Sequence, residues 1–321
     1  MKKTFEHFDT YILVICISLL IFLYGTTSAS GSEEAVIAPL ASQSLLLDAQ
    51  RVENTLIVVG ERGHILISED NGNSWTQSQV PTRATLTGVY FIDRLNGWVV
   101  GHDQVILRTG DGGKSWELVY EDAEAESPLL DILFLDGKHG YAIGAYGQFL
   151  ESFDGGSSWE GRWISEDDFH LNQIIAVGDQ LFIAAEAGFV YRSDDQGQTW
   201  TLLDPDYQGS FFGIFPGEKG RLLLFGLRGH LFHSDDSGET WAAATTGTEA
   251  SLTSGIRLSD GTLVITGLAG ALLTSHDNGS TFILHQDPDR KGFSQLLQAA
   301  DDSIIALGDF GVTKLPQQSI H

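Results

Sequence analysis

An eight-residue motif recurs along this chain at a nearly constant spacing. Its first copy, residues 68–75, reads Ser-Glu-Asp-Asn-Gly-Asn-Ser-Trp, and the later copies keep the Asp, the Gly, the Ser or Thr before the end, and a closing aromatic residue. We call this motif the aspartate box. The closing aromatic residues are separated by 41 or 43 residues, and they are Trp75, Trp116, Trp159, Trp200, Trp241 and Phe282. A period of this length matches one four-stranded blade of a β-propeller.

A second repeat gives the number of blades. Tight turns of the type Gly-x-x-Gly, or close variants of it, separate apolar runs at residues 60–63, 101–104, 144–147, 185–188, 226–229, 267–270 and 308–311. Seven turns and six aspartate boxes indicate seven blades. β-branched and aromatic residues fill short runs that Gly, Asp and Asn separate, as is typical of strands. In the second blade we expect strands at residues 88–92, 97–101, 105–109 and 116–120.

The last repeat contains only three strand-like runs, near residues 295–299, 304–307 and 312–315, before Pro316 ends the pattern. A missing fourth strand leaves an open edge. We expect residues 36–40 to supply it, because Pro39 is tolerated in an outer strand with one free side. The fold prediction is therefore an all-β, seven-bladed propeller that an N-terminal strand closes.

The N-terminal residues predict export. Lys2 and Lys3 precede an apolar run at residues 11–24 and small residues at 27–31, as in a secretory signal. We expect residues 1–30 to be that signal, with an uncleaved anchor as the alternative, and residues 31–321 to form one propeller in the periplasm or another extracytoplasmic compartment. The single cysteine, Cys16, lies in the apolar run. The exported chain then has no thiol for a disulfide, a zinc thiolate or a nucleophile.

The charge of the chain restricts its partners. The formal net charge is −25 at pH 7, which repels nucleic acid and anionic lipid headgroups. We therefore expect no nucleic-acid binding, no direct lipid binding by the propeller, and a monomer. Acidic residues gather at 121–126 and 166–168, in two neighbouring interblade loops. These loops are either solvated surface or a patch for a basic partner or a divalent cation.

The aspartate boxes predict structure rather than catalysis. In residues 193–200, Asp195 can accept backbone N–H bonds in a turn, Gly197 can supply a left-handed backbone position, and Trp200 can fill the gap between blades. All copies share this chemistry, whereas an active site needs one exceptional copy. We predict no catalytic residue, no metal site and no cofactor.

Two pairs of runs resemble a known family. Residues 97–101 with 106–116, and residues 140–144 with 153–159, look like the repeat unit of the photosystem II stability/assembly factor family. The resemblance implies an exported, non-enzymatic, seven-bladed propeller that helps assemble a membrane protein complex in photosynthesis. It also implies an arginine-rich patch. At the matching third-strand position this chain has Arg108 and Arg192, and elsewhere Ile67, Glu151, His233, Thr274 and Lys314.

Three alternatives stay open. Bacterial sialidases carry the same box, but their Arg-Ile-Pro start and grouped arginines are not found in this sequence. A sialidase-type glycoside hydrolase is therefore the enzyme alternative, and the turnover of fluorogenic sialosides would reveal it. The client could instead be another envelope complex such as an exporter. A small-ligand sensor that uses the axial channel is the third alternative.

The tips of the seven turns differ from blade to blade, as a recognition surface requires. They are Arg62, Asp103, Tyr146, Ala187, Arg228, Ala269 and Phe310. Arginine and aromatic residues are enriched at interface hot spots. We therefore predict that a membrane protein or envelope protein docks on Arg62, Tyr146, Arg228 and Phe310. The alternative docking site is the acidic loops around Glu124 and Asp167.

Overall fold

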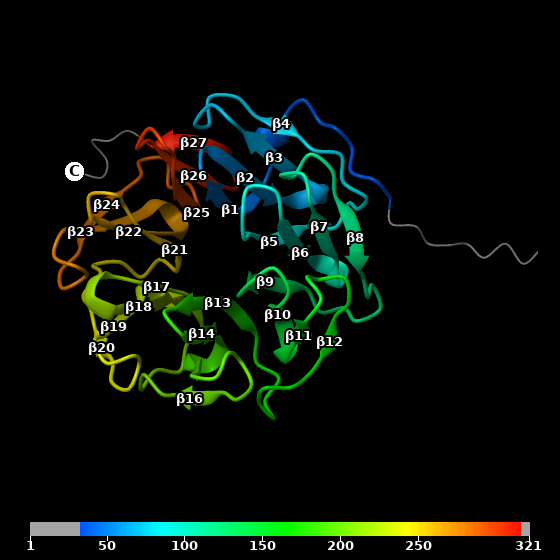
Figure 1. The fold of residues 1–321 in the computed structure, drawn as a ribbon. Coiled ribbons are helices and arrows are strands. Elements are labelled where there is room, and N and C mark those ends of the chain that lie inside the picture. Colours follow the sequence, from blue (N-terminus) through cyan, green and yellow to red (C-terminus); the bar gives the residue numbers. More distant parts are fainter. Residues whose placement is uncertain (1–32, 316–321) are drawn as a thin grey trace, which may run out of the picture. The chain divides into compact units, whose positions relative to one another are not determined.

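The computed structural model describes residues 33–315, so the predicted signal at residues 1–30 lies outside the described part of the chain. Residues 34–315 form seven antiparallel sheets around an axis, which confirms the predicted all-β, seven-bladed propeller (Figure 1). Helical segments within these residues are single 3-10 turns. No helix between residues 33 and 315 is long and apolar enough to cross a membrane.

The strands of each blade follow in chain order from the axis outward. The first three blades contain β1 (Leu46–Val52), β2 (Thr55–Gly60), β3 (Ile65–Ser68), β4 (Thr76–Gln77); β5 (Leu86–Phe91), β6 (Gly97–Gly101), β7 (Ile106–Thr109), β8 (Glu117–Tyr120); and β9 (Leu129–Phe134), β10 (Gly140–Gly144), β11 (Phe149–Ser152), β12 (Glu160–Gly161). The next three contain β13 (Leu171–Val177), β14 (Gln180–Ala185), β15 (Val190–Ser193), β16 (Thr201–Leu203); β17 (Phe211–Pro216), β18 (Leu222–Gly226), β19 (Leu231–Ser234), β20 (Ala242–Ala243); and β21 (Leu252–Arg257), β22 (Leu263–Gly267), β23 (Ala271–Ser275), β24 (Ile283–Gln286). The seventh contains β25 (Phe293–Gln298), β26 (Ile304–Gly308) and β27 (Gly311–Leu315).

Short 3-10 turns join second to third strands in the first six blades. These turns are η2 (Glu61–Gly63), η3 (His102–Gln104), η4 (Ala145–Gly147), η5 (Glu186–Gly188), η7 (Leu227–Gly229) and η8 (Leu268–Gly270); η1 (Ala41–Gln43) and η6 (Glu218–Gly220) lie elsewhere. In the first blade, a Cβ on Gly60 would lie 2.2 Å from the carbonyl oxygen of Leu45. Gly63 has a φ of +71°, which favours glycine. Gly60 therefore permits the turn to lie close to the backbone of Leu45, and Gly63 permits the left-handed backbone conformation that ends the turn.

The aspartate box is a hydrogen-bonded loop between the third and fourth strands. In the fourth blade, Asp195 Oδ1 accepts from the Thr199 backbone N–H at 2.9 Å, and its Oδ2 accepts from the Thr199 hydroxyl at 2.6 Å. Gly197 has a φ of +79°. Trp200 packs edge-to-face on Phe149 of the preceding blade, with 5.9 Å between ring centroids. The predicted roles of Asp195, Gly197 and Trp200 are confirmed.

The hydrophobic core lies between blades rather than within them. Each of its seven clusters joins side chains of neighbouring sheets. One cluster packs Leu56 and Val58 of the first blade against Leu297 and Ile305 of the seventh. The two ends of the repeat array are therefore joined by side-chain packing, and the ring closes without a shared sheet.

The predicted closing strand at residues 36–40 is wrong. Among the described residues the seventh sheet has three strands, and this segment lies along the first blade instead. Ala35 N–H donates to the carbonyl of Val80 at 2.8 Å. The side-chain amide of Gln77 donates to the carbonyl of Val36 at 3.0 Å and accepts from Ala38 N–H at 2.8 Å. The side-chain amide of Gln77 on the outer strand of the first blade thus satisfies the backbone groups of Val36 and Ala38 and fixes this segment to the first blade.

Polar side chains link the innermost strands around the axis. Each innermost strand has a free edge, and an N–H on that edge can be satisfied by a side chain of the preceding blade. Asp48 accepts from Val89 N–H at 2.8 Å, and Asp131 accepts from Ile174 N–H at 2.8 Å. The blade seven amide of Gln295 also donates to Asp48 Oδ1 at 2.8 Å, which adds a polar link across the ring closure.

We expect Asp195→Ala to lower the melting temperature at neutral pH, because the box loop loses the carboxylate that orders it. Hydrogen bonds from Thr199 hold the pKa of Asp195 at about 2, below the ordinary value of 3.8. The stabilisation is therefore present above pH 3.8 and is lost as pH falls toward 2. Thermal melts across this range should show the difference from wild type shrink in acid. Asp179→Ala, which removes the same charge from an exposed turn, is the control; an equal loss there would contradict the assignment.

We expect the buried aspartates on the innermost strands to have the opposite effect on the pH dependence of stability. Burial, together with the nearby Asp48 charge, raises the pKa of Asp131 to about 8. The folded protein then holds a proton that the unfolded chain releases near pH 3.8, so this contribution to stability falls as pH rises through about 8. Urea unfolding at pH 5 and pH 9 should show a smaller difference for Asp131→Asn than for wild type. An unchanged pH dependence in this variant would refute the raised pKa.

Candidate functional site

The four predicted docking residues lie on one end of the propeller but do not form one site. Here we call this end the turn face, because the turns between second and third strands form it. Tyr146 and Arg228 are exposed, as is the side chain of Arg62. Phe310 packs edge-to-face on Phe293, with 5.7 Å between centroids, and Lys291 Nζ lies 5.4 Å from its ring. The Phe310 ring is therefore partly covered by side chains of its own blade and is less available to a partner.

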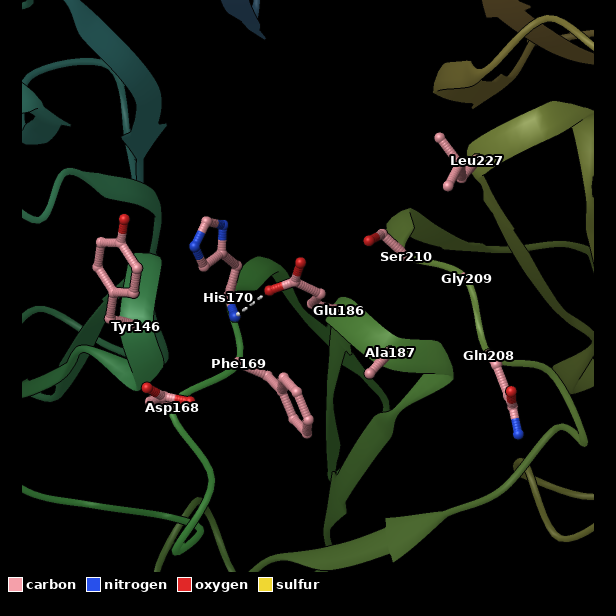
Figure 2. Close-up of a pocket in the computed structure, with 10 residues that line it drawn as sticks. All are labelled: Tyr146, Asp168, Phe169, His170, Glu186, Ala187, Gln208, Gly209, Ser210 and Leu227. Carbon is pink, nitrogen blue, oxygen red and sulfur yellow. Dashed lines mark hydrogen bonds between the residues drawn. The ribbon is translucent and has the colours of Figure 1, made fainter.

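A groove of about 470 Å³ opens on the turn face across the third, fourth and fifth blades (Figure 2). It is lined by Tyr146, Asp168, Phe169, His170, Glu186, Ala187, Gln208, Gly209, Ser210 and Leu227. Of the predicted docking residues, Tyr146 lines this groove. Arg228 lines a neighbouring groove of about 440 Å³ with His230 and Glu249. We call the first of these the blade-four groove.

Local hydrogen bonds position the rim of the blade-four groove. Gly147 N–H, at the end of η4, donates to the carbonyl of Phe169 at 2.9 Å, which ties the turn to the following interblade loop. The Tyr146 ring lies edge-to-face on the His170 ring, with 4.9 Å between centroids. Glu186 belongs to η5, and its Oε2 accepts from the His170 backbone N–H at 3.3 Å. The two aromatic rings and the carboxylate therefore lie around one opening (Figure 2).

The charge of the groove is negative. Asp168 and Glu186 line it, and its lining contains no Lys or Arg. The interblade loop that continues into this lining, residues 163–170, contains three acidic residues and no Lys or Arg, and the loop at residues 121–127, which packs on the blade-two turn, contains four more. The alternative prediction of an acidic docking area around Asp167 thus falls next to the same groove that Tyr146 lines.

Sequence reasoning missed His170, Glu186 and Ser210. They come from three different segments, and only the stacking of blades brings them together. Glu186 carried a signal, since it occupies the first variable position of the fourth turn, next to the tip residue Ala187.

A partly buried polar network lies on the opposite, box-bearing end. His139 Nε2 lies 2.8 Å from Glu151 Oε1, Tyr141 OH lies 2.7 Å from His139 Nε2, and Arg162 Nε donates to Glu151 Oε2 at 2.8 Å. A sialidase nucleophile would require an activated tyrosine beside a glutamate. Burial instead raises the pKa of Tyr141, and its hydroxyl donates to the Gln196 carbonyl in the next aspartate box. This network joins two blades.

The two arginines at the third-strand position also join blades. Arg108 Nη1 donates to the hydroxyl of Ser157 at 3.1 Å, in the box of the following blade. Arg192 Nη1 donates to the carbonyl of Ser237 at 2.9 Å and lies 2.8 Å from Glu239 Oε1. Both side chains therefore bind the next aspartate box.

Comparison with known proteins agrees with the fold and the repeats. The family profile described as photosynthesis system II assembly factor YCF48 matches residues 68–127 and 121–296. A structure of YCF48 bound to a D1 peptide shares 21% identity, covers 89% of this chain and 94% of that chain, and has a TM-score of 0.69. A streptogramin B lyase structure, at 14% identity over 88% of this chain and 96% of that chain, has a TM-score of 0.75. At these identities the structures show a shared fold.

Shorter matches connect the chain to curated relatives. The photosystem II assembly protein Ycf48 of Thermosynechococcus vestitus is 47% identical over 45 residues, which are 14% of this chain and 13% of that protein. The uncharacterized protein YkuO of Bacillus subtilis is 38% identical over 74 residues, 23% of this chain and 24% of that protein. The chain thus matches less than a quarter of the length of each relative. Because the family profile spans most of residues 68–296, the chain belongs to the YCF48 family of photosystem II assembly factors.

Proposed function

We propose that this protein is a non-enzymatic scaffold that binds an extended segment of a membrane protein on its turn face and thereby assists assembly of a membrane protein complex. The blade-four groove carries this proposal, because it is the place where an exposed aromatic tip and convergent polar groups meet. Membership of the YCF48 family supports it, as does the D1 peptide bound by a YCF48 of the same fold.

We infer an extracytoplasmic location from the basic start and apolar run of residues 1–24. A segment of a membrane protein that emerges into that compartment is available to a propeller there. Photosystem II is the complex that the family points to, and an exporter or another envelope complex is the alternative client.

The enzyme alternative has a specific form, because streptogramin B lyase shares the fold. Ser210, His170 and Glu186 all line the groove. An activated serine requires a hydrogen bond to its base. Within residues 33–315, Glu186 bonds the backbone of His170, and the Ser210 hydroxyl is not bonded to the His170 ring. The geometry therefore supports binding better than nucleophilic catalysis.

A photo-cross-linking amino acid in place of Tyr146 tests the proposed function. Tyr146 is 53% exposed on the turn face, and Phe153, 63% exposed on the box-bearing end, provides a matched position. In intact cells we expect position 146 to form an adduct with an extramembrane segment of a membrane protein, identified by mass spectrometry, and position 153 to form none. Equal adducts from both positions, or an adduct from position 153 alone, would contradict docking on the turn face.

A further inference from the structure

We propose that the blade-four groove recognises a cationic peptide segment, in which an Arg or Lys side chain binds between Glu186 and Asp168 and against the rings of Tyr146 and His170. This inference rests on the proposed function and specifies the chemistry of the segment that is bound. Four observations carry it, and the first is a comparison between two turns of the same propeller.

The first blade contains the same turn with its own cation. Glu61 occupies the position of Glu186, and each glutamate accepts from a backbone N–H of the strand-entry loop: Leu45 N–H at 3.4 Å and His170 N–H at 3.3 Å. In the first blade the next residue is Arg62, whose Nε lies 3.9 Å from Glu61 Oε2. In the fourth blade the next residue is Ala187. The structure gives Glu186 no ion pair within residues 33–315, so its charge is available to a ligand.

The second observation is the negative electrostatic potential that acidic residues produce at the groove. Asp168 lines the same groove and is exposed, and Glu166 and Asp167 precede it in the same loop. The loop before the third blade, residues 121–127, contains four further carboxylates and packs on the neighbouring blade-two turn, so it adds to the negative charge of this side of the propeller rather than to the groove lining. A groove lined by charge of one sign raises the local concentration of oppositely charged ligand and speeds its association. A basic segment is therefore favoured over a neutral or acidic one.

The third observation is the aromatic surface beside these carboxylates. Tyr146 is 53% exposed, and its ring and that of His170 meet edge-to-face at the groove (Figure 2). Trp163 is 66% exposed and lies against Gly147, where a Cβ would be 3.1 Å from the indole ring. Aromatic faces attract ammonium and guanidinium groups and also bury the apolar stem of Lys or Arg.

The fourth observation is the far wall of the groove. Gln208 and Ser210 line it opposite Tyr146, and Leu227 adds an apolar side chain (Figure 2). An amide and a hydroxyl can bond the peptide groups of an extended chain, while Leu227 offers contact to an apolar residue of that chain. The complete groove fits a basic residue with apolar neighbours, in a segment that has no secondary structure of its own.

The test uses two synthetic peptides and the folded full chain. One peptide is short and unstructured, with arginine spaced among serine and leucine, and the other carries citrulline at each arginine position, which keeps the shape and removes the charge. By fluorescence anisotropy we expect the arginine peptide to bind about two- to fivefold more tightly, and this advantage to shrink as salt is added. Equal binding of the two peptides would overturn the inference.

Three variants locate the effect. Glu186→Gln keeps the shape of the side chain and should remove most of the advantage of the arginine peptide. Ala187→Arg should do the same, because it supplies the internal cation that Arg62 supplies in the first blade; the φ of +58° at both positions shows that arginine is tolerated there. Glu61→Gln is the matched control and should leave binding unchanged. An effect of Glu61→Gln equal to that of Glu186→Gln would also overturn the inference.

The outcomes separate this inference from the proposed function. A client adduct at position 146 with no preference for arginine would leave the scaffold in place and reject the cationic segment. A preference for arginine that depends on Glu186, without any client adduct, would retain the chemistry of the groove and reject the scaffold. Thermal melts of every variant establish that each comparison is made between folded proteins.

Discussion

One repeated interaction, a donor from one blade bonded to the aspartate box of the next, reinforces the apolar packing between neighbouring blades. The box loop places two successive residues in left-handed conformations, such as Gln196 and Gly197 at φ +56° and +79°. Its carbonyls then face the preceding blade, where an unpaired buried carbonyl would cost free energy. Donors of different chemistry satisfy these loops: Ser78 to Gly113, Trp98 to Gly155, Arg162 to Gly197, Arg192 to Ser237, Arg221 to Asn278 and, at the ring closure, Lys314 to the Asn73 side chain. Repetition of one loop thus holds neighbours together in sequence.

The two ends of the propeller differ in charge, because arginine side chains bind the aspartate boxes at one end. Arg108, Arg162, Arg192 and Arg221 all bind box loops, so the charge of these four guanidinium groups lies at the box-bearing end. The interblade loop at residues 163–170, which continues into the blade-four groove, contains three carboxylates and no Lys or Arg. The arginines at the third-strand position, which the family resemblance associates with a patch for partners, are here engaged between blades. The arginines that bind the boxes are therefore not among the residues that line the groove, whose charged side chains are Asp168 and Glu186.

The sequence predicted what repetition encodes and missed what depends on contacts between repeats. The repeat period predicts the number and length of the blades. The hydrogen bonds and packing of the box follow from its residue types, as Asp195 and Trp200 show. Residues 36–40 were placed wrongly, because strand counting could not reveal that the amide of Gln77 would pair with them. The groove was missed because its lining comes from three blades. Phe310 differs from the other tips because Gly308 pairs with Gly311 across a two-residue turn in the seventh blade. In contrast, the sequence alone shows that Glu186 lacks a neighbouring cation, because Ala187 follows it where Arg62 follows Glu61 in the first turn.

The same geometry explains how one repeat can present different surfaces. Six tips adopt the left-handed conformation at φ between +54° and +58°, whether the residue is Arg62, Tyr146 or Ala187. Flanking glycines favour this turn, since Gly60 and Gly144 both approach the preceding loop too closely for any Cβ, but the fourth turn keeps the same tip conformation with Ala185 in the first position. The tip side chain itself projects away from these contacts. A change of tip therefore alters charge and shape on the turn face while the hydrogen bonds and packing of the blade persist, and the contrast between Arg62 beside Glu61 and Ala187 beside Glu186 is such a change. The tips can thus differ in charge and size without any change in the boxes that join neighbouring blades, and the proposed docking surface depends on this separation.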